Sequence, residues 1–279
     1  MFAEQVTRPD AYHAEGPIWD ARSGRLMWVD LLRGDVLSLA PGSTDITRVH
    51  VDDRVAGCIV PRAAGGWVVA TERGFAFLDE AGRIERLEDV WSDPAIRMND
   101  GACDAEGHFF CGSMAYDASP GQGALYRLDP DRSVYTVHTG VTISNGIGWA
   151  PDGEVAYYID SPTHRIDVCS PDLSIRRPFV EIPAELGLPD GLTVDAEGGI
   201  WVALWGGSAV HRYTAAGALD AVIELPVRQP SSCTFGGDDL GTLFITTSAL
   251  DLADPEPEAG AIFAVRPGVR GLPANPFAG

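Results

Sequence analysis

Short runs of alternating apolar and polar residues, separated by turn-forming clusters, recur along the whole chain. In LTVDAEGGIWVAL (192–204), two apolar runs flank the cluster Asp-Ala-Glu-Gly-Gly, which predicts two antiparallel strands and a tight turn. AVHRYTA (209–215) and DAVIELP (220–226) follow with the same chemistry and complete a group of four strands. Sustained 3.6-residue periodicity is missing, and only PAELGLP (183–189) predicts a single helical turn. The pattern therefore predicts an all-β protein.

This four-strand pattern repeats six times. The repeats align on one position, occupied by Gly16, Gly57, Gly101, Gly146, Gly191 and Thr234, at intervals of 41 to 45 residues. Four strands in a repeat of this length are typical of a propeller blade. We therefore predict one six-bladed β-propeller domain over residues 1–279. A β-sandwich is the structural alternative, but it does not explain the period.

The last repeat is one strand short. Its final strand-like segment is GAIFAVRP (260–267), and no fourth strand follows. The segment before Glu15 is predicted to pair there, so that the N- and C-terminal strands meet in one blade. Such closure removes the open sheet edges that promote aggregation.

The residue before each repeat position varies in a way that suggests a binding site. The six residues are Glu15, Ala56, Asp100, Asn145, Asp190 and Cys233. The first strand of each propeller blade lines the central channel, so these side chains are expected to converge at one end of it. Carboxylates brought together in this way need a positive partner, and no Lys or Arg occupies an equivalent position.

A divalent metal ion is the partner that this set predicts. Glu15, Asn145 and Asp190 are the predicted ligands, and Asp100 is left open as either a ligand or a brace for its loop. Oxygen ligands suit Ca²⁺, Mg²⁺ and Mn²⁺, while the lack of histidine in the ring disfavours Zn²⁺ and Fe²⁺ without excluding them. A lone Asp or Asn before Gly is usually turn chemistry. The shared register across repeats is what favours the metal hypothesis.

Residues near the ring are candidate ligand contacts. Arg97 and Asn99 lie three residues and one residue before Asp100, and they are predicted to hold hydroxyl or carbonyl oxygens of a ligand. Further candidates with weaker support are Asp117, Tyr116 and Trp205. The histidines show no metal spacing or dyad and are interpreted as structural. Two serines beside the ring, Ser113 and Ser144, lack the nucleophile-elbow context of a serine hydrolase.

Charge and composition limit the kinds of binding partner and the cellular location that are expected. The net charge is −20, from 40 acidic and 20 basic residues, which disfavours nucleic acid. There is no run of 18 apolar residues and no signal-peptide start, so a cytoplasmic protein without membrane contact is expected. The five cysteines are dispersed, which disfavours disulfides and a thiolate zinc site. A monomer is the default expectation.

At these residues the chain resembles the gluconolactonase family that includes senescence marker protein, or regucalcin. The resemblance covers nearly the whole chain. It is carried by the order and spacing of the motifs EGPIWD, RMNDGACDAEGHFFCGSM, GALYRLD, SNGIGWAPDG, YYIDS, PDGLTVDAEGGIWVA and GLPANPFAG. It implies a six-bladed propeller that binds one divalent metal through Glu15, Asn145 and Asp190.

The resemblance also implies lactonase activity on sugar lactones, with Arg97 and Asn99 contacting the substrate. Some relatives carry a substrate-contacting Glu in the loop where this chain offers Asp117. That loop is also shorter here, so the preferred sugar is expected to differ.

The chemistry expected from these features is metal-assisted hydrolysis of a sugar lactone, with Asp190 accepting a proton from the attacking water. Two alternatives remain open at this point. One is a related propeller esterase acting on aryl or organophosphate esters. The other is a non-enzymatic calcium-binding or interaction module.

Overall fold

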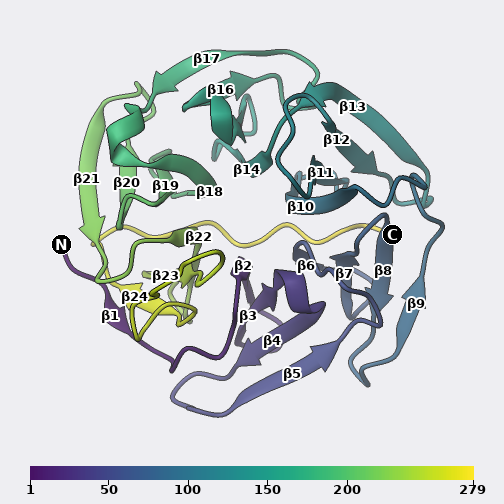
Figure 1. Ribbon diagram of the computed structural model, residues 1–279, viewed down its shortest axis with the longest axis horizontal. Coiled ribbons are helices and arrows are strands. Elements are labelled where there is room, and N and C mark those ends of the chain that lie inside the picture. The colour runs from purple at the N-terminus through teal and green to yellow at the C-terminus, as the bar shows by residue number, and fades with distance from the viewer.

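Six four-stranded antiparallel sheets are arranged around a central axis in the computed structural model, which describes all residues from Met1 to Gly279 (Figure 1). This confirms the predicted six-bladed propeller. The first three blades are β2 (Ala14–Asp20), β3 (Arg25–Asp30), β4 (Asp35–Leu39) and β5 (Ile46–His50); β6 (Ile59–Pro61), β7 (Trp67–Ala70), β8 (Phe75–Leu78) and β9 (Ile84–Arg86); and β10 (Ile96–Cys103), β11 (Phe109–Ala115), β12 (Gly123–Leu128) and β13 (Val134–Val141).

The other three blades complete the circle. They are β14 (Ser144–Trp149), β15 (Ala156–Asp160), β16 (Arg165–Cys169) and β17 (Arg176–Glu181); β18 (Leu188–Val194), β19 (Ile200–Trp205), β20 (Ala209–Tyr213) and β21 (Leu219–Glu224); and β22 (Pro230–Gly236), β23 (Thr242–Thr247), β24 (Phe263–Val265) and β1 (Glu4–Gln5). The only helical turns are η1 (Leu31–Arg33), η2 (Ser161–Thr163) and η3 (Ala184–Leu186). The last of these is the turn predicted from the sequence.

The two ends of the chain close the ring as predicted. The N-terminal strand β1 pairs with β24 and supplies the outer strand of the sixth blade, with Glu4 opposite Ala264 and Gln5 opposite Phe263. The segment before β1 also reaches the fifth blade, where the Ala3 amide donates to the carbonyl of Glu224. The first residues of the chain therefore join two neighbouring blades.

The repeated glycines are explained by the close approach of the inner strands. A Cβ atom at Gly146 would lie 2.6 Å from the backbone nitrogen of Leu192, and one at Gly57 would lie 2.5 Å from the carbonyl oxygen of Asn99. Both contacts are with the backbone of the next inner strand, which cannot move away. Glycine at this position therefore lets six strands converge on one axis.

Apolar side chains fill the space between neighbouring blades. The largest cluster joins the fifth and sixth blades, where the Trp201 and Phe235 rings meet edge to face with centroids 5.9 Å apart. Because each blade buries both of its faces against its neighbours, the inner strands are held rigidly and present a fixed set of side chains at the axis.

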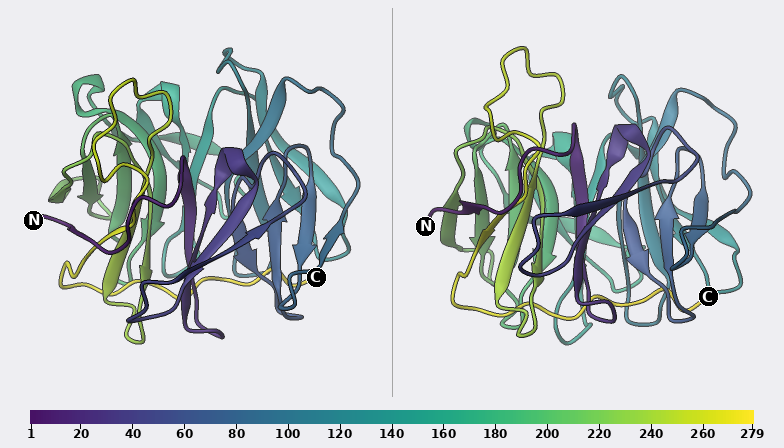
Figure 2. Two further views of the ribbon diagram at one scale, coloured as in Figure 1. Left: turned by 60° about the horizontal axis from the view of Figure 1, so that its bottom comes forward. Right: turned by 90° about the horizontal axis from the view of Figure 1, so that it is seen from below.

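The C-terminal tail crosses the lower face of the propeller (Figures 1 and 2). Its Phe277 is fully buried and exchanges backbone hydrogen bonds with the second blade, from its amide to the Pro61 carbonyl and from the Ala63 amide to its own carbonyl. Above residues 272–275 of the tail lies a cavity of about 150 Å³ in the channel. The tail thus closes the lower mouth of the channel, and the longer loops lie at the upper mouth.

All five cysteines are buried and free, in agreement with the sequence interpretation. No helix in the structure is both long and apolar enough to cross a membrane.

Candidate functional site

The six residues predicted to form a ring are all buried at the channel, and three of them carry carboxylates. Glu15 and Asp190 are each 5% exposed, and Asp100 is 9% exposed. Burial, followed by the charges of Asp190 and Asp100, raises the pKa of Glu15 well above its ordinary value. Burial and the charge of Asp100 likewise raise the pKa of Asp190. The structure therefore brings these carboxylates close enough to repel one another.

These carboxylates are poorly satisfied by the protein. The Asp190 carboxylate accepts no hydrogen bond from the protein. The Glu15 carboxylate accepts only one, from the backbone amide of the adjacent Gly16 at 3.3 Å. The unpartnered polar side-chain atoms that are sealed from solvent all lie elsewhere, on Trp67, His164, Arg176 and Glu256. The free oxygens of Glu15 and Asp190 therefore face accessible space in the channel, as ligands for a cation must.

Asn145 is held with its oxygen available to the same space. Its Nδ2 donates to Ser161 Oγ at 2.7 Å, and that hydroxyl donates to the Pro189 carbonyl at 2.6 Å. Its Oδ1 accepts a hydrogen bond of 2.8 Å from Asn99 Nδ2, which leaves a second lone pair free. The side-chain amide is therefore fixed in one orientation, with an oxygen toward the ring.

Asp100 lies deeper in the channel than the other two acids. Its Oδ1 accepts the Gly101 amide at 2.8 Å, and its side chain lines the cavity above the C-terminal tail. Burial raises its pKa to about 6, although the Gly101 hydrogen bond opposes this shift. One oxygen thus holds the amide of the next residue within strand β10, and the other is free. Both roles left open by the sequence are compatible with this geometry.

Arg97 is the buried cation that faces the ring. Its guanidinium donates through Nη1 to Asn99 Oδ1 at 2.6 Å and to the Met98 carbonyl at 3.0 Å, while Nε and Nη2 have no protein partner. Burial lowers its pKa to about 10, and the charges of Tyr116, Glu15 and Asp190 oppose that shift. The group stays positively charged at neutral pH, with two nitrogens free for a ligand.

Asn99 links the cation to the ring. Both hydrogens of its Nδ2 are used, by the Ser144 carbonyl and Asn145 Oδ1, each at 2.8 Å. Its Oδ1 is shared with Arg97. Asn99 can therefore meet a substrate only as an acceptor, and it also positions Arg97 and Asn145.

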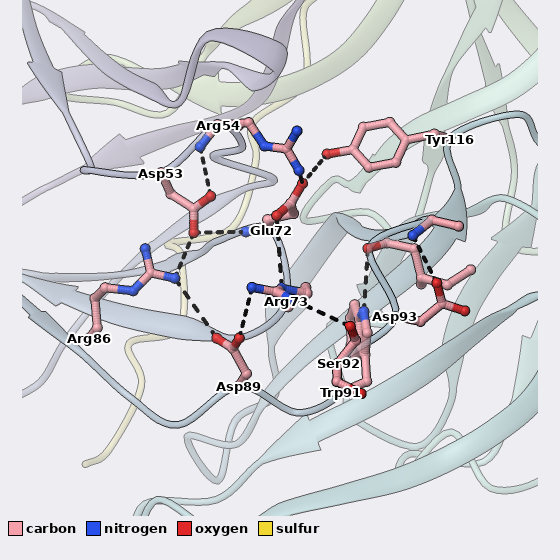
Figure 3. A network of polar contacts seen from close by, with 12 residues as sticks. Asp53, Arg54, Glu72, Arg73, Arg86, Asp89, Trp91, Ser92, Asp93 and Tyr116 are labelled. Atoms are coloured by element: carbon pink, nitrogen blue, oxygen red, sulfur yellow. Dashed lines mark hydrogen bonds and ion pairs between the residues drawn. The ribbon is translucent and has the colours of Figure 1, made fainter.

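Tyr116 forms a wall beside Arg97 at the rim of the site. Its ring centre lies 5.9 Å from the Arg97 guanidinium carbon. Its hydroxyl donates to Glu72 Oε1 at 2.6 Å, and Arg54 pairs with the same carboxylate (Figure 3). By contrast, Asp117 is exposed on the following turn and accepts the Ser119 amide at 3.0 Å. Its contact with a substrate stays a prediction.

Trp205 lies against His13, one of the histidines for which the sequence predicts only a structural role. The rings of Trp205 and His13 meet edge to face, with centroids 5.5 Å apart. His13 is 4% exposed, and burial together with the charge of Arg97 lowers its pKa to about 3. The available signal was its position two residues before Glu15, because alternate residues of a strand share a face.

A second group of acids lies at the opposite end of the molecule. Asp104, Glu106 and His108 offer ligand atoms within 4.8 Å of one another on the turn between β10 and β11. Asp104 already accepts the His108 amide at 2.8 Å and contacts its ring Nδ1 at 2.7 Å. This cluster is accounted for by the turn.

Comparisons with known proteins find relatives that match nearly the whole chain. A family model described as the SMP-30/Gluconolactonase/LRE-like region matches residues 13–249. The chain is 36% identical to regucalcin of Danio rerio, over 95% of this chain and 94% of that protein. It is 33% identical to the putative sugar lactone lactonase YvrE of Bacillus subtilis, with the same coverage. The crystal structure of a calcium-binding protein, regucalcin, from Agrobacterium tumefaciens superimposes with a TM-score of 0.91 at 26% identity, covering 98% of this chain and 97% of that one.

Proposed function

Because the chain belongs to the SMP-30/Gluconolactonase/LRE-like family, whose model matches residues 13–249, we propose that it hydrolyses sugar lactones to sugar acids with the aid of one divalent metal ion. The observation that carries the proposal is the ring of buried oxygens opposite Arg97. Glu15 and Asp190 have almost no hydrogen bonds from the protein, and Asn145 is fixed with its oxygen inward.

The residues present fit such an ion. Two or three carboxylates and one amide oxygen form an all-oxygen set, which suits Ca²⁺, Mg²⁺ and Mn²⁺ best. Glu15, Asn145 and Asp190 would hold the ion, and Asp100 is the candidate for a further oxygen. When bound, the ion would supply a Lewis acid for the lactone carbonyl and increase the acidity of water.

The side chains perform the rest of the reaction. A carboxylate oxygen of Asp190 takes a proton from water as the water oxygen bonds to the lactone carbonyl carbon. The bond from that carbon to the ring oxygen then breaks, and the proton passes from Asp190 to the leaving oxygen, which becomes a hydroxyl. Arg97 orients oxygens of the substrate through its two free nitrogens, and Asn99 keeps Arg97 in place.

A substrate panel tests the class of ester. Gluconolactone and pentonolactones represent the proposed substrates, while phenyl acetate and a phosphotriester represent the esterase alternative. The charged side chain of Arg97 and the polar side chain of Asn99 favour hydroxylated lactones, so the kcat/KM for these lactones is expected to be highest. A higher kcat/KM for the aryl ester or the phosphotriester would contradict the proposal, and metal binding without any hydrolysis would favour the calcium-binding module.

The ring carboxylates predict how metal stabilisation depends on pH. The pKa values of Glu15, Asp100 and Asp190 in the folded protein lie above those in the unfolded chain, and the pKa of Asp100 is raised to about 6. In the metal-free protein their contribution to stability is fully present below about pH 4 and is lost as pH rises through the folded values. A metal ion competes with these protons, so its stabilising effect should grow over the same window.

Thermal unfolding with and without metal measures this effect. The rise in Tm caused by saturating metal is expected to be larger at about pH 8 than at about pH 5. The difference in Tm between metal-loaded and metal-free protein removes the contribution of groups that titrate elsewhere in the protein, because they affect both forms equally. An equal rise at both pH values would contradict a site made of these carboxylates.

A further inference from the structure

His13 is held rigidly above the ring by three different segments. Its backbone amide donates to Asp30 Oδ1 at 3.0 Å, and its carbonyl accepts the Leu31 amide at 2.9 Å. It also forms an antiparallel bridge with Ser248. Since residues two apart on a strand share a face, its side chain lies on the same side as that of Glu15, about 7 Å farther along the strand.

The hydrogen bonds of Ser248 determine which ring nitrogen of His13 carries the proton. Ser248 Oγ lies 2.9 Å from His13 Nδ1 and accepts the Leu250 amide at 3.0 Å. The hydroxyl hydrogen has no acceptor other than Nδ1, so we assign the direction in which Ser248 donates to Nδ1, because it leaves both groups satisfied. A neutral imidazole with Nδ1 as acceptor carries its hydrogen on Nε2.

The Nε2 atom is the free end of the His13 ring. It has no hydrogen-bond partner in the protein, and it is not among the unpartnered polar atoms that are sealed from solvent. The ring is 4% exposed, stands against Trp205, and senses the charge of Arg97. A rigid N–H donor therefore faces the small accessible space between these side chains.

We propose that His13 Nε2–H binds a ring hydroxyl of the substrate and so selects polyhydroxylated lactones over unsubstituted ones. The inference rests on the proposed lactonase function and specifies its substrate class. The reacting carbonyl belongs beside Asp190 and Arg97, and His13 lies about one strand repeat above Glu15, where hydroxyls rather than the ester are expected. His13 is thus a specificity residue, and Ser248 is its positioning residue.

The ratio of kcat/KM for gluconolactone to that for δ-valerolactone, which has no hydroxyls, is the most direct readout. His13→Phe keeps an aromatic ring beside Trp205 but removes the donor, and it is expected to lower this ratio by about 10- to 100-fold. His13→Gln, whose amide can donate from a similar place, should recover most of it. The ratio for Ser248→Ala should lie between those of wild type and His13→Phe, because both imidazole tautomers of His13 become populated. His50→Phe, an exposed site on another strand, is the control.

Binding of 1,5-anhydroglucitol provides a readout that does not depend on hydrolysis. This compound has the ring hydroxyls but no ester, and NMR titration of metal-loaded protein should show that His13→Phe weakens its binding and His13→Gln restores it. If wild type binds it with this pattern but hydrolyses no lactone, the lactonase proposal fails and the His13 contact stands. The role of His13 would be overturned if His13→Phe left the ratio of the two kcat/KM values unchanged, which includes an equal loss for both lactones, and also left the binding of 1,5-anhydroglucitol unchanged.

Discussion

Replacing Asp190 by Asn is expected to lower kcat for sugar lactones by about 1,000-fold, within the 10²- to 10⁴-fold range typical of a lost general base. The amide has nearly the same size and keeps one carbonyl oxygen, but it cannot take a proton from water. Initial rates at saturating metal, compared with wild type, measure the loss.

The same substitution should leave the metal-free fold intact or more stable. The Asp190 carboxylate is 5% exposed, accepts no protein hydrogen bond, and faces other carboxylates, so its charge is costly to bury without metal. A neutral amide avoids that cost, and the Tm of metal-free Asp190→Asn at neutral pH should equal or exceed that of wild type. Asp152→Asn, on an exposed turn, is the control. If Asp190→Asn retained its kcat, the role of Asp190 as the base would be overturned. If its Tm were strongly lowered, the loss of activity would be explained by impaired folding instead.

Arg97→Met is expected to lower kcat/KM for sugar lactones by about 100-fold, because a hydrogen bond to a charged group is worth about 1.5–3 kcal/mol. Methionine keeps an unbranched stem within the buried site but removes the two free guanidinium nitrogens. The substitution also removes the charge that holds Asn99 Oδ1 at 2.6 Å. Steady-state kinetics at saturating metal give the effect.

A measurement of metal affinity distinguishes the loss of a substrate contact in Arg97→Met from a distortion of the metal-binding ring. Arg97 is a cation near Glu15 and Asp190, and it therefore opposes a bound divalent ion. Calorimetric titration at about pH 8 should show affinity for metal in Arg97→Met that is equal to or higher than in wild type. Arg177→Met, exposed on the outer strand β17, is the control. A large fall in metal affinity would mean that Arg97 supports the ring rather than the substrate.

The fold was predictable because its determinants are local and repeated. Five of the six repeats place a glycine at the position where inner strands approach closely, and Gly146 and Gly57 show directly that a side chain would not fit there. Turn clusters then fix the strand pairs, and the missing strand of the last repeat requires β1. The converging residues before the glycines follow from this register, which is why the buried positions of Glu15, Asn145 and Asp190 could be anticipated.

Features that depend on contacts between distant segments were not predictable. His13 lies beside Trp205 and Ser248, which follow it by 192 and 235 residues, and no local sequence pattern indicates that these residues meet. The rim pairing of Tyr116 with Glu72 joins the third blade to the second in the same way. The prediction for Asp117 rests on its place in a loop, and the sequence does not specify the path of that loop in space.

The proposed divalent ion at the ring is central to the mechanism, and removing divalent metal is the most direct test of it. Protein stripped with a chelator, and shown by elemental analysis to be metal-free, should not hydrolyse gluconolactone at constant pH. Adding back single divalent ions at stoichiometric amounts should restore turnover for wild type. Glu15→Gln should need at least about 100-fold more metal, since it loses a ligand rather than a supporting contact. Full hydrolysis by metal-free protein, or the same metal requirement in Glu15→Gln, would contradict the account.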